Sequence, residues 1–313
     1  MIEVDPIQNL ERVYLQTIST CPANCVFCPY AESWHKSNPG KMKLSLFRTI
    51  LDQLEDFKNF KTLCPYLMNE PLTDNRLPDL IWNFYNKYPD KRVELSVNPY
   101  SLTHDMSDRL IDVLSDRDHL INISFNGTNQ ASFEYVMQIP FKVSFNNLIY
   151  FLENSVDHEL NITITGSGKS VKDSRKFFYK SEYANFWRQV INDYRLRAHF
   201  DITIRDFDDR AGNLRRDDRG AKDFNLNIRR DLEDSYCTMY DKVLCVLWNG
   251  DVAACVMDYR HEVKLSNLNN VTIVDHYSSE EYRDFVGQAT GYDPSPIDFI
   301  CRRCGYPSTL EEK

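Results

Sequence analysis

Residues 19–30 read Ser-Thr-Cys-Pro-Ala-Asn-Cys-Val-Phe-Cys-Pro-Tyr and place three cysteines, Cys21, Cys25 and Cys28, within eight residues. Three thiolates can hold three irons of a four-iron, four-sulfur (4Fe–4S) cluster, whereas four thiolates would close every coordination position. The iron that is left open is what a reactive metal centre needs for a substrate or cofactor. A zinc site, or a disulfide with a spare thiol, remains an alternative for these residues by themselves.

The composition is that of a folded protein with a sizeable core. The chain has 313 residues, of which 42% are hydrophobic, enough for one large domain or for one large and one small domain. No apolar stretch is long enough to span a bilayer, and residues 1–12 are polar and acidic, so we expect a cytoplasmic protein without membrane contact. The net charge of −9 makes nucleic acid an unexpected partner. Nine cysteines in a large chain without a leader favour metal binding over disulfides.

Short apolar runs alternate with amphipathic stretches as far as residue 205. Strands are expected at Val13–Thr20, Thr62–Met68, Val93–Asn98, Leu120–Phe125, Asn161–Thr165 and His199–Arg205. Helices are expected between them, for example at residues 44–57, 77–88, 106–116 and 186–196. This alternation predicts the α/β class, as a partial (β/α)6 barrel of the TIM type with parallel strands. In such a fold the chemistry lies in the loops at the carboxyl ends of the strands.

The sequence changes in character after residue 205. Residues 206–236 are dense in Arg and Asp and predict a solvated linker between a barrel domain at 1–205 and a small module at 237–313. Within this module, residues 242–259 predict two strands joined by a turn at Asn249-Gly250-Asp251, and a helix is expected near Ser279–Gln288. A module of this size often depends on metal to supplement its core.

A second set of cysteines lies in this module. The four candidates for metal ligands are Cys237, Cys255, Cys301 and Cys304. A pair separated by two residues, as in the last two, is usual for zinc and for iron–sulfur clusters, so ligand counting leaves both open. Cys64 and Cys245 lie within expected strands and are predicted to be packing residues.

The two cysteine sets together resemble the radical SAM superfamily, whose enzymes use S-adenosylmethionine (SAM). The first set, with Phe27 before its last cysteine, is similar to the superfamily's cluster motif. The second set, with twelve residues between Cys237 and Gly250 and four between Gly250 and Cys255, resembles the "twitch" module, a shortened SPASM domain. The resemblance implies SAM as cofactor and two 4Fe–4S clusters, one that binds SAM on the first three cysteines and one auxiliary cluster on the other four.

The resemblance also implies residues that bind SAM. Asn69-Glu70-Pro71 resembles the family's Gly-Glu-Pro motif, with Asn69 in place of glycine, and implies that Glu70 binds the SAM ammonium. The other residues implied are Ser96 and Asn98 lining the SAM pocket, Ser124 and Asn126 on the ribose or carboxylate, Phe27 and Tyr30 flanking the adenine or shielding the cluster, and Arg205 on the carboxylate. Ordinary turn capping is the alternative for the polar strand ends.

Arg210-Ala211-Gly212 resembles an Arg-Xaa-Gly segment of twitch-bearing dehydrogenases of the 2-deoxy-scyllo-inosamine dehydrogenase type. In those enzymes the arginine faces the substrate, which implies a catalytic-site role for Arg210. A surface salt bridge is the alternative.

The expected function is that of a radical SAM oxidoreductase. Reductive cleavage of SAM would yield an adenosyl radical that removes a substrate hydrogen, in a two-electron oxidation of a small alcohol or sugar-like metabolite. The auxiliary cluster would accept an electron, and a flavodoxin- or ferredoxin-type protein would be the reductant. An alternative is a maturase that forms a thioether, a carbon–carbon link or an inverted stereocentre in a ribosomal peptide, although Cys21 leaves no room before it for a peptide-recognition domain. A non-enzymatic zinc protein is a further alternative.

Overall fold

The computed structural model describes residues 5–167, 180–205, 210–214, 232, 235–304 and 308–309. The chain packs as two compact units. The first unit contains Met1–Ser19, Pro29–Asn69 and Asp208–Lys313, and the second contains Thr20–Cys28 and Glu70–Phe207. Most of the expected linker at 206–236 lies outside the described residues. The domain boundaries expected at residues 205 and 237 therefore stay predictions.

The second unit is built on a parallel sheet. Its strands are β3 (Arg92–Val97), β4 (His119–Ser124), β5 (Ile162–Ser167) and β6 (Asp201–Arg205), in the spatial order β6-β5-β4-β3. Every neighbouring pair is parallel. Buried and less buried residues alternate along β3 and β4, as a sheet with one apolar face requires. Their carboxyl ends, which carry the predicted site residues, therefore lie at one edge.

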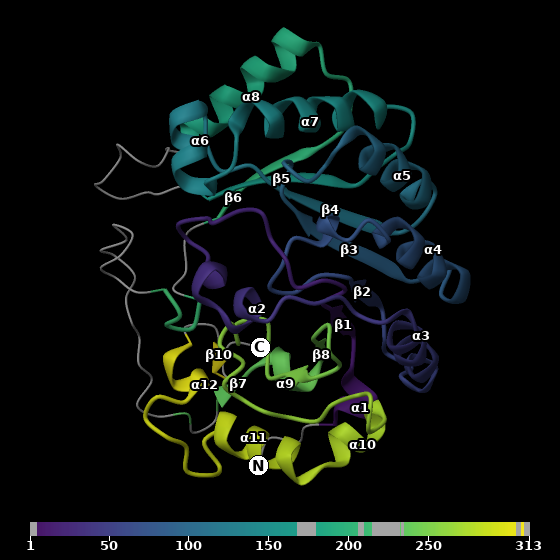
Figure 1. The fold of residues 1–313 in the computed structure, drawn as a ribbon, viewed down its shortest axis with the longest axis vertical. Coiled ribbons are helices and arrows are strands. Elements are labelled where there is room, and N and C mark those ends of the chain that lie inside the picture. The colour runs from purple at the N-terminus through teal and green to yellow at the C-terminus, as the bar shows by residue number, and fades with distance from the viewer. Residues whose placement is uncertain are drawn as a thin grey trace. The chain divides into compact units, whose positions relative to one another are not determined.

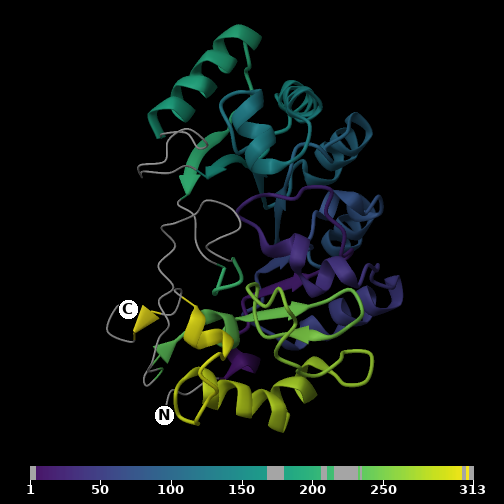
Figure 2. The same cartoon turned by 60° about the vertical axis from the view of Figure 1, so that its left-hand side comes forward.

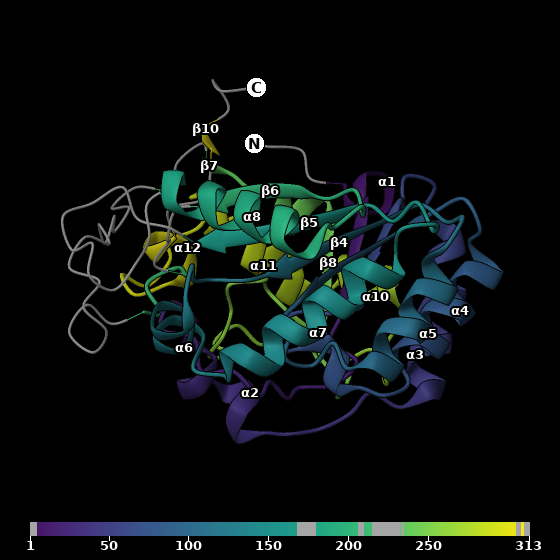
Figure 3. The ribbon, with the colours of Figure 1, turned by 90° about the horizontal axis from the view of Figure 1, so that it is seen from above.

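Helices separate these strands in the chain. They are α4 (Leu77–Lys87), α5 (His104–Leu114), α6 (Gln130–Met137), α7 (Phe141–Asn154) and α8 (Lys180–Tyr194), with a short 3₁₀ helix η3 (Pro71–Thr73). In α4 the buried residues Leu77, Leu80, Ile81 and Phe84 recur every three or four positions and form one apolar stripe. Helices α4, α5 and α7 lie side by side along the strands (Figure 1, Figure 3).

Four further strands lie in the first unit. They are β1 (Arg12–Leu15), β2 (Thr62–Cys64), β8 (Val243–Val246) and β9 (Val252–Ala253), in the order β2-β1-β8-β9. Strand β1 pairs in parallel on both sides, with β2 and with β8. The pairing of β8 with β1 joins segments more than two hundred residues apart and was not predicted from the sequence.

The remaining elements of the first unit are short. They are α1 (Pro6–Asn9), η1 (Pro29–Glu32), α2 (Trp34–Ser37), α3 (Leu44–Gln53), η2 (Leu54–Asp56), β7 (Ser235–Tyr236), α9 (Thr238–Asp241), α10 (Ile273–Ser278), α11 (Glu280–Ala289), α12 (Ile300–Arg303) and β10 (Ser308–Thr309). The predicted hairpin is confirmed as antiparallel β8 and β9, drawn in green in Figure 2. Gly250 in its turn has φ +91°, a conformation that favours glycine.

The predicted secondary structure is largely confirmed. All six expected strands are present, and β1, β2 and β6 are shorter than expected. The expected helix near Ser279–Gln288 is confirmed as α11, with Ser279 as its N-cap. Helices α6, α7 and α10 were not named from the sequence. No helix of the described residues is both long and apolar enough to cross a membrane.

Candidate metal and cofactor sites

The first three cysteines lie in a loop that is fixed to the end of α6, within the second unit. The backbone N–H of Val26 donates to the carbonyl of Val136 at 2.9 Å, and Asn24 Nδ2 donates to Gln138 Oε1 at 3.0 Å. Cys25 Sγ lies 3.7 Å from both the carbonyl oxygen and Sδ of Met137. The loop between two cluster ligands is therefore held in place by contacts made by the protein itself.

The three thiols of this loop form one electrostatic group. Burial raises the pKa of Cys25 well above its usual value, and the nearby thiols of Cys28 and Cys21 raise it further. Such a group is hard to ionise by itself, but a coordinating metal removes the thiol proton outright. The donor set is therefore suited to iron.

Glu70 is buried and fully engaged in hydrogen bonds. Its Oε2 accepts from both the backbone N–H and Nδ2 of Asn98, each at 2.7 Å, while Oε1 accepts from the N–H of Leu72 at 3.1 Å. Burial raises its pKa to about 8, although the backbone N–H groups of Asn98 and Leu72 act in the opposite direction. The carboxyl group is thus held in one orientation at low exposure, which suits recognition of a cation.

Asn98 is itself held by the following loop. Its Oδ1 accepts from the N–H of Tyr100 at 3.1 Å, and Asn147 on α7 donates to the carbonyls of Pro99 and Tyr100 at 3.1 and 3.0 Å. No sequence signal pointed to Asn147, because its position on α7 is 49 residues from Asn98. A polar chain therefore runs from α7 to the carboxyl end of β3 and on to Glu70.

The other predicted strand ends lie at the same edge of the second unit. Ser96 and Ser124 are half-buried in β3 and β4, Asn126 is buried just beyond β4, and Arg205 is the exposed last residue of β6. Asn126 Nδ2 donates to Met137 Sδ at 2.9 Å, and its Oδ1 accepts from the N–H of Ser167 at 2.5 Å.

Thr165 Oγ1 in β5 is buried without a hydrogen-bond partner among the described residues, and in the first unit the same is true of Asn69 Nδ2. Thr165 pairs in register with Ser124, and sequence reasoning missed it. Its position at the end of an expected strand was the available signal. Unsatisfied buried groups are costly, so each of these atoms could be satisfied by a polar ligand in its own unit.

Phe27 and Tyr30 differ in their surroundings. Phe27 is half-buried in the cysteine loop of the second unit. Tyr30, in η1 of the first unit, is 5% exposed, donates from its hydroxyl to the carbonyl of Ser19 at 2.8 Å, and has Lys36 Nζ 5.7 Å from its ring centre. These contacts give Tyr30 a structural role in its own unit.

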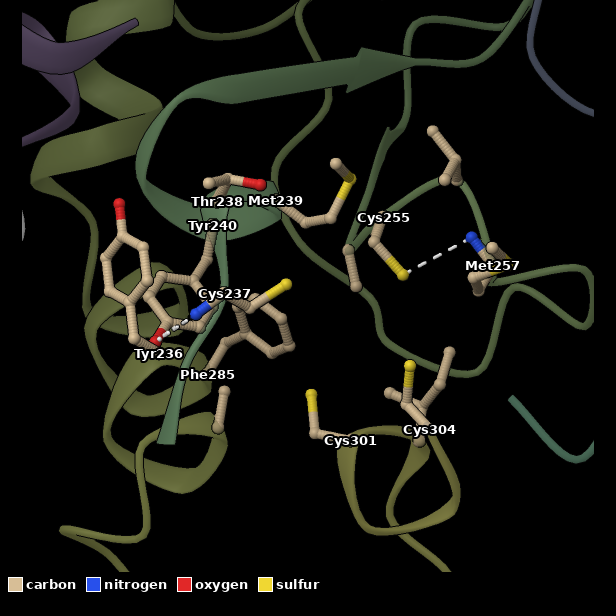
Figure 4. Close-up of a pocket in the computed structure, with 14 residues that line it drawn as sticks. Tyr236, Cys237, Thr238, Met239, Tyr240, Cys255, Met257, Phe285, Cys301 and Cys304 are labelled. Atoms are coloured by element: carbon tan, nitrogen blue, oxygen red, sulfur yellow. Dashed lines mark hydrogen bonds between the residues drawn. The ribbon is translucent and has the colours of Figure 1, made fainter. Parts of the chain in front are cut away.

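The second set of cysteines surrounds a cavity in the first unit. The cavity has a volume of about 160 Å³ and is lined by Cys237, Cys255, Cys301 and Cys304. Figure 4 shows the four side chains pointing into this shared space, from the start of α9, the segment after β9, and α12. Much of the remaining lining is apolar, including Met239, Ala254, Phe285 and Ile300. The structure therefore brings together all four predicted auxiliary ligands.

Backbone N–H groups are directed at two of these sulfurs. The N–H of Met257 donates to Cys255 Sγ at 3.3 Å. Cys237 is the N-cap of α9, and its sulfur accepts from the N–H of Tyr240 while its own N–H donates to Tyr240 Oη at 2.9 Å. Both bonds are arranged to stabilise a thiolate.

The geometry favours clusters over zinc or disulfides. No disulfide joins any of the nine cysteines, all of which lie in the described part of the chain. Among the described residues, no group of three or more His, Cys, Asp or Glu side chains is placed to hold a single metal ion. Zinc needs its sulfurs about 2.3 Å from one point, whereas each cysteine of a cluster binds a different iron. Thiols spread around a cavity fit the larger group.

Arg210 lies in an unusual turn. Arg210, Ala211 and Gly212 have φ angles of 51°, 55° and 70°, a left-handed run that is costly for the first two residues. Asn213 Nδ2 donates to the carbonyls of Arg210 and Met257 at 2.7 and 2.8 Å. Ala211 is buried against Met257 and Ile300, which line the cavity. The turn that carries Arg210 is thus attached to the wall of the cysteine cavity.

Cys64 and Cys245 are packing residues, as predicted. Both are buried in strands, at 0% and 2% exposure. Cys245 packs with Val243, Leu247 and Ala253, and it does not line the cavity. The nine cysteines thus fall into three groups, with three in the loop of residues 21–28, four around the cavity and two buried in strands.

Two models of known protein families match parts of this chain. Residues 15–173 match the radical SAM superfamily, and residues 237–305 match the iron–sulfur cluster-binding domain called SPASM. The first match alone covers half of the chain. No curated protein sequence is similar enough to count as a match.

Solved structures share the fold at low sequence identity. BtrN in complex with AdoMet (SAM) and 2-DOIA has a TM-score of 0.56 and 13% identity, covering 95% of this chain and 93% of BtrN. SuiB from Streptococcus suis bound to the precursor peptide SuiA has a TM-score of 0.62 and 11% identity, covering 96% of this chain and 72% of SuiB. Native anSMEcpe with bound AdoMet has a TM-score of 0.51 and 12% identity, covering 95% and 86%. The predicted partial-barrel fold class is confirmed.

Proposed function

Because this chain belongs to the radical SAM superfamily, we propose that it catalyses the two-electron oxidation of a small alcohol or sugar-like metabolite. As a member of that superfamily it is an enzyme that binds SAM and a 4Fe–4S cluster, and its SPASM domain binds auxiliary iron–sulfur. When bound, SAM and the clusters supply the redox chemistry, namely removal of a hydrogen atom from a substrate carbon followed by loss of one proton and one electron.

The observation that carries the proposal is the complete set of four cysteines around the auxiliary cavity. Four thiolates close all positions of one cluster and leave no iron open for a substrate. A closed site in an apolar setting is suited to carrying an electron, and an oxidation requires an electron acceptor. BtrN in complex with AdoMet and the small molecule 2-DOIA offers further support, since 93% of its chain is covered.

The residues predicted to contact SAM keep that role in this proposal. The three cysteines of residues 21–28 would hold the iron cluster, and Glu70, oriented by Asn98, would receive the SAM ammonium. Half-buried Ser96 and Ser124, buried Asn126 and exposed Arg205 of the second unit would contact the remainder of SAM, and Asn69 of the first unit keeps the same predicted role. Phe27 would lie against the adenine or shield the cluster. Tyr30 has the same proposed role, and only its ring would take part, because its hydroxyl donates a hydrogen bond to the carbonyl of Ser19.

Arg210 is the proposed substrate-binding residue. Its left-handed turn is held by Asn213 and by buried Ala211, so backbone strain is maintained at the place where the family resemblance implies a substrate contact. A flavodoxin- or ferredoxin-type protein is the proposed reductant. We retain residues 1–205 as the SAM-binding domain and 237–313 as the auxiliary domain of the proposal.

An anaerobic assay tests this proposal. Reduced, reconstituted enzyme is supplied with SAM and a panel of polyols and amino sugars, and products are followed by mass spectrometry. We expect a product two mass units lighter, with one 5′-deoxyadenosine formed per product. A product of unchanged mass, as in an epimerisation, would rule out the oxidation.

A second candidate is modification of a ribosomal peptide. The observation that favours it is the likeness to SuiB bound to its precursor peptide, with a TM-score of 0.62. The same assay with short Cys- or Ser/Thr-rich peptides separates the two candidates. Formation of 5′-deoxyadenosine that depends on a peptide, and on none of the small molecules, would favour the maturase.

A further inference from the structure

The sulfur atom of Met137 is the point at which three segments of the second unit meet. Met137 is the last residue of α6 (Figure 1), and it is 1% exposed. Its Sδ lies 3.7 Å from Cys25 Sγ in the cysteine loop and accepts a hydrogen bond of 2.9 Å from Asn126 Nδ2, just beyond β4. All three residues belong to the same compact unit. A predicted iron ligand and a predicted SAM contact therefore touch one sulfur atom.

The end of α6 that carries this sulfur is held on both sides. The helix begins with a capping box, in which Asn129 and Ser132 bond reciprocally, and it ends at Gln138, whose φ is +53°. The residues on either side of Met137 both accept hydrogen bonds from the cysteine loop, Val136 through its carbonyl and Gln138 through its side chain. The position of Met137 relative to Cys25 is thus fixed by the backbone as well as by its own contact.

The orientation of the Asn126 amide follows from its two hydrogen bonds. The backbone N–H of Ser167 can only donate, so it must meet the amide oxygen, which it does at 2.5 Å. The amide nitrogen is then directed at Met137, and the whole residue is 1% exposed. An amide nitrogen carries two N–H groups. The second one has no acceptor within the part of the chain that the structure describes, and it can serve a polar ligand.

A thioether meets the needs of both neighbours of Met137. Its sulfur is a weak acceptor, which satisfies one N–H of Asn126, and it is a soft, polarizable contact for the sulfur of Cys25. An alkyl side chain of the same size would fill the space but would leave this buried N–H without its acceptor. Such a group is costly, so the amide would turn away from its present orientation.

We propose that Met137 is a positioning residue that links the SAM-binding cluster to the SAM pocket, because it contacts Cys25 and holds the Asn126 amide in the orientation that SAM meets. The inference deepens the proposed function, since it rests on the proposed SAM contact of Asn126. It does not depend on which reaction follows SAM cleavage.

A double-mutant cycle on the affinity for SAM tests this link, using equilibrium binding to the oxidised, reconstituted protein. Asn126→Ala should weaken binding about tenfold and Met137→Leu about threefold, in keeping with the loss of single hydrogen bonds. In the Asn126→Ala background, Met137→Leu should have no further effect, because the amide that it positions is gone. Met106→Leu on α5 is the matched control, since Met106 is 5% exposed in the same unit and its sulfur makes no hydrogen bond among the described residues. The control should bind SAM normally.

A second replacement covers the case in which Met137→Leu does not assemble its cluster. Site-specific exchange of Met137 for norleucine keeps the length of the side chain and replaces only the sulfur, and iron analysis shows which proteins carry their clusters. Unchanged affinity in the Met137 variants, equal weakening with and without Asn126, or the same loss in the Met106 control would overturn the inference. Normal affinity in Asn126→Ala would overturn both the inference and the proposed SAM contact. Failure of the proposed oxidation is seen separately, because this binding assay contains neither substrate nor reductant.

Discussion

The two metal sites are built in opposite ways. The first takes three cysteines from one loop of eight residues, within the second unit, beside the buried carboxyl group of Glu70. The second takes four cysteines from segments separated by up to 45 residues, within the first unit, around a largely apolar cavity. The first site is thus largely encoded locally, while the second exists only when distant segments converge.

This difference implies different dependence on metal. The cysteine loop of the first site is fixed to the end of α6 by hydrogen bonds of Val26 and Asn24, neither of which is a predicted metal ligand. The four thiols of the auxiliary site are directed into a cavity that side chains do not fill. The surrounding module is small, and its strands β8 and β9 are short. We infer that iron contributes more to folding at the second site, since a site formed from distant segments couples metal binding to folding.

The largest expected effect follows from removing each cysteine set in turn. Replacing Cys21, Cys25 and Cys28 by alanine, or Cys301 and Cys304 by alanine, should each lower iron from about eight to about four atoms per chain. Only the second change should also lower the melting temperature strongly, through loss of several kcal/mol of metal-coupled folding energy. Iron and sulfide analysis with anaerobic calorimetry measures both. Equal melting of the two variants would contradict the inferred contrast.

Next in size is the effect of Glu70→Gln on SAM binding. Hydrogen bonds to charged groups contribute about 1.5–3 kcal/mol, so the affinity for SAM should fall about 10-fold to 150-fold. Iron content should stay the same, because Glu70 is not a ligand. Glu94→Gln in β3 is the control and should bind SAM normally. Equilibrium binding of SAM to the oxidised, reconstituted protein provides the measurement, and wild-type affinity in Glu70→Gln would remove this residue from the site.

The pH dependence of SAM binding gives a finer test of the same carboxyl group. Burial raises the pKa of Glu70 from 4.5 to about 8, so the SAM-free folded protein keeps this proton between these values. This group therefore stabilises the fold below pH 4.5, and that contribution is lost as the pH rises toward 8. The SAM ammonium favours the carboxylate, so SAM should bind more tightly up to about pH 8 and release a proton near pH 7.

Calorimetry in two buffers with different heats of ionisation measures the released proton. Glu70→Gln should abolish the release while Glu94→Gln preserves it. The same proton release in Glu70→Gln and in the wild type would show that another group is responsible.

The contrast between the sites also explains how far the sequence was informative. The cysteine loop, the six strands, the hairpin at Gly250 and the four auxiliary ligands were all predicted, because each depends on local pattern or on cysteine spacing. The pairing of β8 with β1 was not, since partners so distant in the chain leave no periodic signal.

Supporting contacts were missed for the same reason. Asn147 reaches the loop after β3 from α7, and Asn213 reaches the carbonyl of Met257, each across more than forty residues. The role of Asn98 was predicted as a SAM contact, and the structure adds its two hydrogen bonds to Glu70. Local sequence indicates which residues can do chemistry, while the residues that orient them depend on tertiary packing.

The smallest expected change in metal content comes from replacing Cys245, which lies in the hairpin that Cys255 directly follows. Cys245 in β8 packs against Val243 and Ala253, whereas Cys255, ten residues later, faces the cavity. Cys245→Ala should leave about eight irons per chain and cost about 1 kcal/mol of stability, because it removes one buried sulfur from a packed cluster. Cys255→Ala, the matched change, should lose auxiliary iron. If Cys245→Ala lost as much iron as Cys255→Ala, the ligand set would have to include Cys245, and the division of the cysteines into three, four and two would be wrong.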